Sequence, residues 1–166
     1  LFIRNYEGGL FSQYWFNEAK TNDLLRMEGP LGTFFYRNNP ACEEIVLLAT
    51  GTGIAPIKAI LDQWQQQPEQ VKGKKIWLFW GGRKKEDLFW QPQTTLTNFT
   101  YIPVLTREDQ WQGAKGYVQE IALQQPIHWQ KAQVYACGSE LMIQSAQKLL
   151  TQQGLKEENF FSDAFV

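Results

Sequence analysis

The sequence predicts an α/β domain built on a doubly wound parallel β-sheet, spanning residues 40–166. Three short apolar segments indicate buried strands, each closed by glycine or by Thr-Gly: residues 44–49 (EIVLLA), 75–80 (KIWLFW) and 132–137 (AQVYAC). Helical patterns follow the first and the last of them, over residues 55–66 and 140–153, and Gly154 stops the second. Apolar strands that alternate with helices are typical of a parallel sheet covered on both faces.

Residues 1–39 do not follow this alternation. Their pattern predicts strands at residues 1–6 and 24–28 and a short helix at residues 12–19. Two strands and one helix bury too little apolar surface to fold alone. We therefore expect them to complete a barrel or sheet whose other strands precede Leu1, or to pack on the second domain. The apolar run Leu1-Phe2-Ile3 looks like a chain cut inside a domain.

Composition argues against several classes of function. A net charge of -1 without a basic stripe argues against nucleic-acid binding. No apolar run reaches the roughly 18 residues of a membrane span. No signal-peptide pattern opens the chain either, so the sequence predicts a soluble, cytoplasmic protein. Cys42, Cys137 and the single histidine, His128, form no metal-binding motif, so we expect free thiols and no metal site.

The turn Thr50-Gly51-Thr52-Gly53 connects the first strand of the expected sheet to its helix. Backbone N–H groups and the positive end of a helix dipole meet at such a point, which suits a pyrophosphate. The turn has neither the complete G-x-G-x-x-G pattern nor the ending of a P-loop. These residues alone leave two alternatives open, a phosphate cradle and a tight strand-to-helix turn.

Two further stretches carry candidate functional residues. Cys137-Gly138 again ends a strand before a helix, and we expect the Cys137 side chain to project over the carboxyl edge of the sheet, beside residues 51–53. The alternative is a small buried residue before a turn. The tail, residues 160–166, places the acidic Asp163 among aromatic residues, which is less expected of a plain core strand.

Together these stretches resemble the ferredoxin-NADP reductase superfamily. Within it they are similar to the branch of bacterial NAD(P)H-flavin reductases and of the iron-sulfur flavin reductases that serve CDP-6-deoxyhexose (CDP-4-keto-hexulose dehydrase) biosynthesis. The ordered motifs that carry the resemblance cover nearly the whole chain: Gly8-Gly9-Leu10-Phe11-Ser12, Glu28-Gly29-Pro30-Leu31-Gly32, Gly51-Thr52-Gly53-Ile54-Ala55-Pro56, Trp80-Gly81-Gly82-Arg83, Cys137-Gly138 and Asp163-Ala164-Phe165.

The resemblance implies that residues 1–39 are the C-terminal part of an antiparallel FAD-binding β-barrel and that residues 40–166 are an NAD(P)-binding domain. The family's Arg-x-Tyr-Ser segment, which holds the flavin, precedes the part that matches Leu1. We therefore do not expect this stretch alone to close the barrel or to bind FAD tightly.

The resemblance also implies roles for matching residues. Ser12 is expected to cap the helix that meets the flavin pyrophosphate. Cys137 is expected beside the nicotinamide ring, where it supports hydride-transfer geometry without acting as a nucleophile. The expected catalytic residues are Cys137, Thr52, Phe165, which stacks on the flavin, and Asp163 beside it. The expected cofactor-binding residues are Gly9, Leu10, Phe11, Ser12, Thr50, Gly51, Thr52, Gly53, Pro56, Gly81, Arg83, Arg107, Lys115, Tyr117, Cys137, Gly138 and Phe165.

The choice between NADPH and NADH stays open. Arg107, Lys115 and Tyr117 resemble the residues that hold a 2′-phosphate in NADPH-specific relatives, where charge-assisted contacts and stacking on adenine are available. NADH-using relatives instead have Trp-x-Gly segments similar to Trp111-Gln112-Gly113. The charges around Arg83 could also form a solvated loop.

The function that the resemblance implies is transfer of a hydride from NAD(P)H to FAD and of electrons onward to an acceptor. That acceptor could be an iron-sulfur domain, a ferredoxin, free flavin or a dehydrase partner. The first alternative is a non-catalytic electron-transfer or regulatory subunit that only binds nucleotide. The second is a nucleotide-binding domain with another chemistry.

Overall fold

The computed structural model describes residues 2–29 and 31–165. The chain divides into two compact units, Leu1–Thr33 and Phe34–Val166. The boundary expected at residue 40 remains a prediction.

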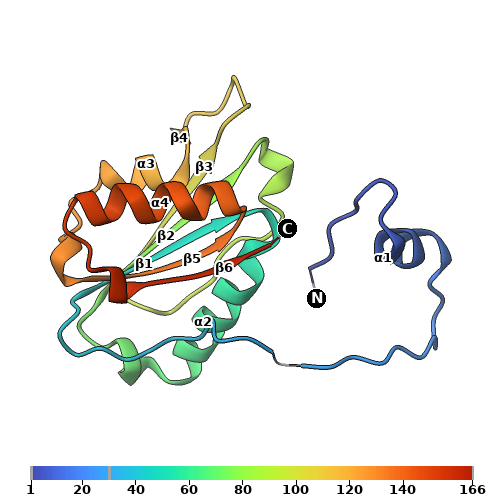
Figure 1. Ribbon diagram of the computed structural model, residues 1–166, viewed down its shortest axis with the longest axis horizontal. Coiled ribbons are helices and arrows are strands. Elements are labelled where there is room, and N and C mark those ends of the chain that lie inside the picture. Colours follow the sequence, from blue (N-terminus) through green and yellow to red (C-terminus); the bar gives the residue numbers. More distant parts are fainter. Residues whose placement is uncertain (1, 30, 166) are drawn as a thin grey trace. The chain divides into compact units, whose positions relative to one another are not determined.

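The second unit is built on a six-stranded sheet in which every pair of neighbouring strands is parallel. The strand order is β4-β3-β2-β1-β5-β6. Helix α2 covers one face of the sheet, and α3 and α4 cover the other (Figure 1). The doubly wound α/β class predicted for this part is confirmed. The strands are β1 Glu44–Thr50, β2 Lys75–Gly82, β3 Phe99–Leu105, β4 Ala114–Lys115, β5 Ala132–Gly138 and β6 Phe160–Ala164.

The helices connect these strands in the alternating manner of a parallel sheet. The α-helices of this unit are α2 Ile54–Gln66, α3 Val118–Leu123 and α4 Glu140–Gln152. The short 3-10 turns are η2 Gly51–Gly53, η3 Pro68–Val71, η4 Lys85–Asp87, η5 Trp129–Lys131 and η6 Glu157–Asn159. Helices α2 and α4 begin at Ile54 and Glu140, within one residue of the predicted starts.

The central strands carry apolar side chains on both faces, which explains why their sequences are continuous apolar runs. On one face Val46 and Leu48 of β1 join the core that includes residues of α3 and α4. On the other, Tyr36 packs on Trp64 of α2 and on Tyr135 of β5, with ring centroids 5.0 Å and 6.1 Å apart. The sheet is therefore held between two hydrophobic layers.

Two strands and one helix of this unit were missed by the sequence reasoning, namely β3, β4 and α3. Strand β3 contains Pro103. Proline lacks a backbone N–H donor, so its presence in an apolar run argues against a strand there. Strand β4 has two residues and α3 has six, so neither is long enough to show a period.

In the first unit the structure differs from the prediction. Its helices are α1 Leu10–Gln13 and the π-helical turn η1 Tyr14–Glu18, whereas one helix over residues 12–19 was expected. The strands predicted at residues 1–6 and 24–28 are wrong for the residues that the structure describes there, 2–6 and 24–28. Strand backbones require a neighbouring strand to bond their N–H and C=O groups, and residues 2–29 and 31–33 supply none.

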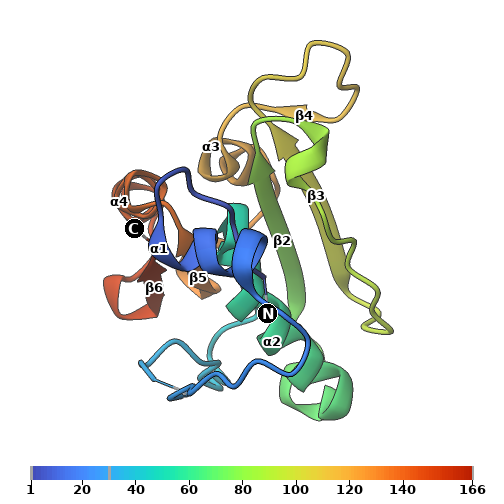
Figure 2. The same cartoon turned by 90° about the vertical axis from the view of Figure 1, so that its right-hand side faces the viewer.

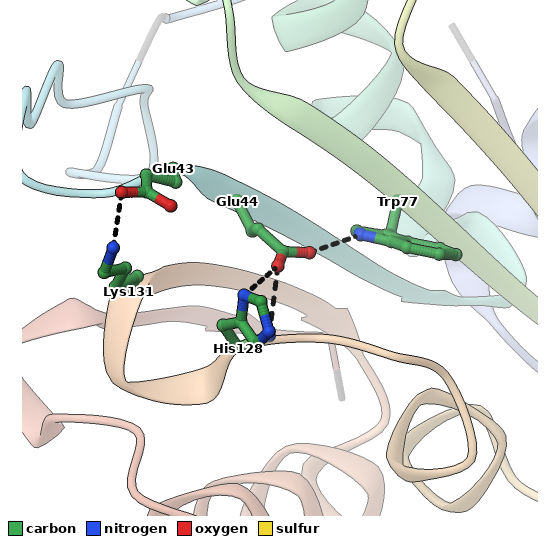
Figure 3. Close-up of polar contacts among 5 residues, drawn as sticks. All are labelled: Glu43, Glu44, Trp77, His128 and Lys131. Carbon is green, nitrogen blue, oxygen red and sulfur yellow. Dashed lines mark hydrogen bonds and ion pairs between the residues drawn. The ribbon is translucent and has the colours of Figure 1, made fainter.

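A buried carboxylate ties the amino ends of three chain segments together (Figure 3). Glu44, the first residue of β1, is 1% exposed. Its carboxylate accepts hydrogen bonds from the Trp77 indole N–H (2.9 Å) and from the backbone N–H of His128 (3.0 Å). The His128 Nδ1 lies 3.5 Å from the same carboxylate. One side chain thus joins β1, β2 and the segment before β5.

We expect Glu44→Ala to lower the free energy of unfolding by about 2–3 kcal/mol, because two partly buried donors lose their acceptor. The adjacent Glu43 is the matched control, since its ion pair with Lys131 (2.6 Å) has side chains that are 58% and 54% exposed. Glu43→Ala should cost less than about 1 kcal/mol. Urea denaturation measures both values, and equal losses would contradict the role given to Glu44.

Candidate functional site

The sheet changes direction between β1 and β5. From β1 the chain builds outward to β2, β3 and β4 on one side, and then to β5 and β6 on the other. In open α/β sheets the crevice outside the carboxyl ends of the strands at such a switch point is where ligands bind. The carboxyl end of β1 leads into the turn of residues 51–53, and that of β5 is the Cys137-Gly138 pair.

These two strand ends are in direct backbone contact. A Cβ built on Gly53 would lie 2.2 Å from the Cys137 carbonyl oxygen, and one built on Gly138 would lie 2.1 Å from the Thr50 hydroxyl oxygen. Gly138 also has φ +137°, a conformation that side chains rarely adopt. Glycine is therefore required at both positions, and the structure brings Thr50, Gly53, Cys137 and Gly138 together.

Hydrogen bonds hold the same turn from two further sides. The Thr50 hydroxyl accepts a bond from the backbone N–H of Ser139 (3.0 Å), and the Trp80 indole donates to the Gly51 carbonyl (3.1 Å). Sequence reasoning missed Ser139 and Trp80 as site residues. A serine directly before a helix is an N-cap signal that indicates Ser139, while the contact of Trp80 has no local sequence signal.

Helix α2 adds its amino end to this point. Its first turn contains Pro56, where a missing backbone N–H costs no helical hydrogen bond. Thr52 lies in the preceding 3-10 turn and is partly exposed. A glycine-containing backbone turn and the amino end of a 13-residue helix at the switch point of the sheet together fit a pyrophosphate.

Cys137 is fully buried at the end of β5. Burial, assisted by the nearby carboxylate of Asp163, raises the pKa of the Cys137 thiol to about 12. The thiol is therefore neutral at pH 7.

We expect the stability of this unit to fall as pH rises above about 9. The ordinary pKa of the thiol is 9.0, and burial raises it to about 12 in the folded state. Between these values the unfolded chain releases a proton that the folded chain keeps, so unfolding becomes more favourable by up to about 1.4 kcal/mol per pH unit. Urea denaturation at several pH values measures the slope.

Cys137→Ala should make this slope shallower between pH 9 and 10. Burial also raises the pKa of the Cys42 thiol from 9.0, so part of the slope remains in the variant. Tyr36, Tyr101 and Tyr135 contribute at higher pH, because burial raises the pKa of each from 10.0 to about 12. Parallel slopes for the wild type and Cys137→Ala would contradict the assignment.

The tail of the chain reaches the same strand end. In β6, Asp163 pairs in register with Cys137. The backbone N–H of Phe165 donates to the Gly138 carbonyl at 2.8 Å. The Phe165 side chain is 41% exposed, so an aromatic ring at this end of the sheet is available for a planar ligand.

The remaining predicted residues of this unit lie at the carboxyl ends of β2, β3 and β4. The N–H of Arg107 donates to the Arg83 carbonyl at 2.8 Å, which sets these two arginines side by side. Lys115 donates to the Asp109 carbonyl (2.8 Å), and Tyr117 is 60% exposed. The connection between β3 and β4 extends beyond the ends of the strands (Figure 2).

Gly81 lies close to the first residue of α3. A Cβ there would lie 2.8 Å from the Val118 side chain. This position therefore allows close packing of α3 on β2.

In the first unit, residues 9–12 form the start of α1. Gly9 is the N-cap of this helix, and the expectation that Ser12 caps it is wrong. Ser12 is buried and its hydroxyl accepts a bond from the Tyr6 N–H (2.9 Å) and donates to the Arg4 carbonyl (3.3 Å). It folds the preceding segment onto the helix. Leu10 and Phe11 are 89% and 57% exposed.

Two classes of site have no counterpart in the described residues. Within 2–29 and 31–165, three or more metal-ligating side chains gather nowhere. No helix in the same ranges has the length and apolar character needed to cross a membrane.

Two known domain families match this chain. The model of the oxidoreductase NAD-binding domain family matches residues 47–148, and that of the oxidoreductase FAD-binding domain family matches residues 1–36. The second match agrees with the expectation that the N-terminal part is the end of a flavin-binding barrel.

Among curated proteins, the CDP-6-deoxy-L-threo-D-glycero-4-hexulose-3-dehydrase reductase of Yersinia pestis is 37% identical over 173 residues, covering 100% of this chain and 50% of the relative. The anthranilate 1,2-dioxygenase electron transfer component of Acinetobacter baylyi is 29% identical, covering 99% and 48%. The chain thus spans about half the length of these curated relatives.

Solved structures share the fold. The ferredoxin reductase in carbazole 1,9a-dioxygenase has a TM-score of 0.77 at 20% identity, covering 99% of this chain and 50% of that one. A ferredoxin NADP+ reductase from Neisseria gonorrhoeae, solved with bound FAD and NADP, has a TM-score of 0.73 at 18% identity, covering 96% and 71%.

Proposed function

This chain belongs to the ferredoxin-NADP reductase superfamily, and on that premise we propose that the whole protein is an NAD(P)H-dependent flavoprotein reductase. The observation that carries the proposal is the direct contact between the carboxyl ends of β1 and β5 at the switch point of the sheet. This contact brings the glycine turn of residues 51–53, the buried thiol of Cys137 and the exposed ring of Phe165 to one end of the sheet.

We assign the nucleotide's pyrophosphate to the backbone of residues 51–53 and the amino end of α2. Cys137 and Thr52 would then border the nicotinamide, and Phe165 the flavin ring. Asp163 would keep negative charge beside Cys137, which favours the neutral thiol. Residues 9–12 would hold part of the FAD, whose chemistry would supply the acceptance of a hydride from NAD(P)H and the single-electron transfer to the acceptor.

For the nucleotide's adenosine end, the proposed contacts are Arg83, Arg107, Lys115 and Tyr117. Neither arginine forms an ion pair with another residue of the described part of the chain, so both are available to a phosphate group. NADPH and NADH both remain candidates. The ratio of kcat/KM with NADPH to kcat/KM with NADH distinguishes them. Arg107→Ala should lower this ratio only if the 2′-phosphate is bound here.

The acceptor is proposed by class: an iron-sulfur domain, a ferredoxin, free flavin, or a dehydrase or oxygenase partner. The relatives named above are a dehydrase reductase and a dioxygenase electron transfer component, which supports an electron-transfer role. We place the protein in the cytoplasm, where the cell keeps NAD(P)H as a reductant.

The test is anaerobic addition of NADPH or NADH to the whole protein. We expect the visible absorbance of bound flavin to bleach, with saturation at rising nucleotide concentration. A whole protein that binds nucleotide but carries no flavin and oxidises no NAD(P)H would instead be a binding subunit.

A further inference from the structure

We infer that Thr50 is a positioning residue whose hydroxyl fixes the Cys137–Ser139 turn against the nucleotide-binding turn. The inference rests on the proposed reductase function. It concerns how the two strand ends are held, and it differs from the expectation that Thr50 simply contacts the cofactor.

The sheet itself does not make this connection. Backbone pairing between β1 and β5 ends at Ala49–Cys137, whereas pairing between β1 and β2 continues to Thr50–Gly81. Beyond Ala49, the Thr50 hydroxyl takes over by accepting the Ser139 N–H at 3.0 Å. A side chain therefore continues the link between β1 and β5 past the end of the ladder.

The start of α4 explains why Ser139 needs this partner. Ser139 is the N-cap, and its own hydroxyl accepts from the Met142 N–H. In a capping box the N3 side chain would accept the N–H of the cap residue. Here N3 is Met142, whose thioether is a poor acceptor, so Thr50 serves as that acceptor from another strand.

The turn held in this way carries the groups proposed to meet the nicotinamide and the flavin. Gly138 lies against Thr50, because only a residue without Cβ fits there. The Gly138 carbonyl accepts from Phe165, so the tail is attached to the same turn. A shift of this turn would move Cys137 and Phe165 together relative to residues 51–53.

Thr50→Val keeps the shape of the side chain but removes the acceptor, and Thr50→Ser keeps the hydroxyl. In the whole protein, stopped-flow flavin bleaching gives both the limiting rate of reduction and the apparent Kd for NAD(P)H. For Thr50→Val we expect the limiting rate to fall about 10-fold or more and the Kd to change less than about 3-fold. Thr50→Ser should retain the rate within about 3-fold.

Thr100, exposed on β3, is the matched control. Thr100→Val should leave both the limiting rate and the Kd unchanged. A Thr50→Val protein with a weaker Kd and a normal limiting rate would overturn the inference and make Thr50 an ordinary nucleotide contact.

A second measurement is independent of the reductase activity. Ser139 is exposed, so its amide is protected from hydrogen exchange mainly by its bond to Thr50. Mass-spectrometric exchange of a peptide covering residues 138–142 should be faster in Thr50→Val than in the wild type, Thr50→Ser or Thr100→Val. Unchanged exchange overturns the inference, whereas a wild type that reduces no flavin but shows this pattern overturns only the proposed function.

Discussion

Gly53→Ala is expected to lower the free energy of unfolding by about 2–3 kcal/mol and to abolish nucleotide binding. The added Cβ would lie 2.2 Å from the Cys137 carbonyl oxygen and 2.5 Å from its carbon. Both are backbone atoms of a central strand, so no side-chain rotation relieves the contact. The turn of residues 51–53 therefore has to move away from β5. This movement breaks the contact between the two strand ends, on which the proposed phosphate-binding geometry depends.

The conformation of Gly53 makes this a test of steric fit alone. Its φ is -58°, which alanine adopts readily. Gly73 offers the opposite case, because its φ is +80° and its Cβ would meet nothing within 4 Å. Gly73→Ala should cost about 1–2 kcal/mol through backbone strain. It should leave nucleotide binding intact, since Gly73 lies just before β2, at the amino ends of the strands and away from the proposed site.

Thermal shifts with and without NAD(P)H measure both consequences. The wild type and Gly73→Ala should gain Tm on adding nucleotide, and Gly53→Ala should gain none. A Gly53→Ala protein of normal stability and normal nucleotide-dependent shift would show that the two strand ends are not packed as described.

The central strands were predictable because burial on both faces leaves a direct trace in the sequence. Residues 45–49 of β1 are all fully buried, and the run is correspondingly apolar. Strand β3 lies nearer the edge of the sheet and contains Pro103, so its sequence does not have this pattern. The prediction of strands in the first unit was wrong for another reason. A strand forms only beside a neighbouring strand, and the local sequence does not show whether such a neighbour is present.

The site was predictable as a set of motifs but not as a structure. Residues 50–53 are compatible with a cradle and with a tight turn, and no property of these four residues decides between them. What distinguishes the structure is that Gly53 packs on the carbonyl of Cys137, 84 residues later in the chain. Such a contact depends on strand order, which periodicity does not reveal. The acceptor role of Thr50 and the contact of Trp80 were unpredictable for the same reason.

Cys137→Ala is the change from which we expect the largest loss of catalytic rate. The proposed hydride transfer requires the nicotinamide to lie in a defined position over the flavin, and the Cys137 side chain lies at the strand end that borders this position. Shortening it removes packing atoms there, whereas the pyrophosphate is held by backbone groups of residues 51–53 that the substitution does not alter. We expect the limiting rate of flavin reduction in the whole protein to fall about 10- to 100-fold, with the Kd for NAD(P)H changed less than about 3-fold.

Cys42 provides a control of the same residue type at the amino end of the sheet, opposite the end where Cys137 lies. It is 3% exposed, lies just before β1, and its sulfur accepts a hydrogen bond from Asn159 at 3.6 Å. Cys42→Ala should lower stability by about 1 kcal/mol, as expected for a small buried side chain. It should leave the rate of flavin reduction unchanged. If both variants lose the same fraction of rate, the loss follows from stability alone and Cys137 has no role in positioning the nicotinamide. If only Cys137→Ala loses rate while both remain folded, the buried thiol acts on the hydride-transfer geometry.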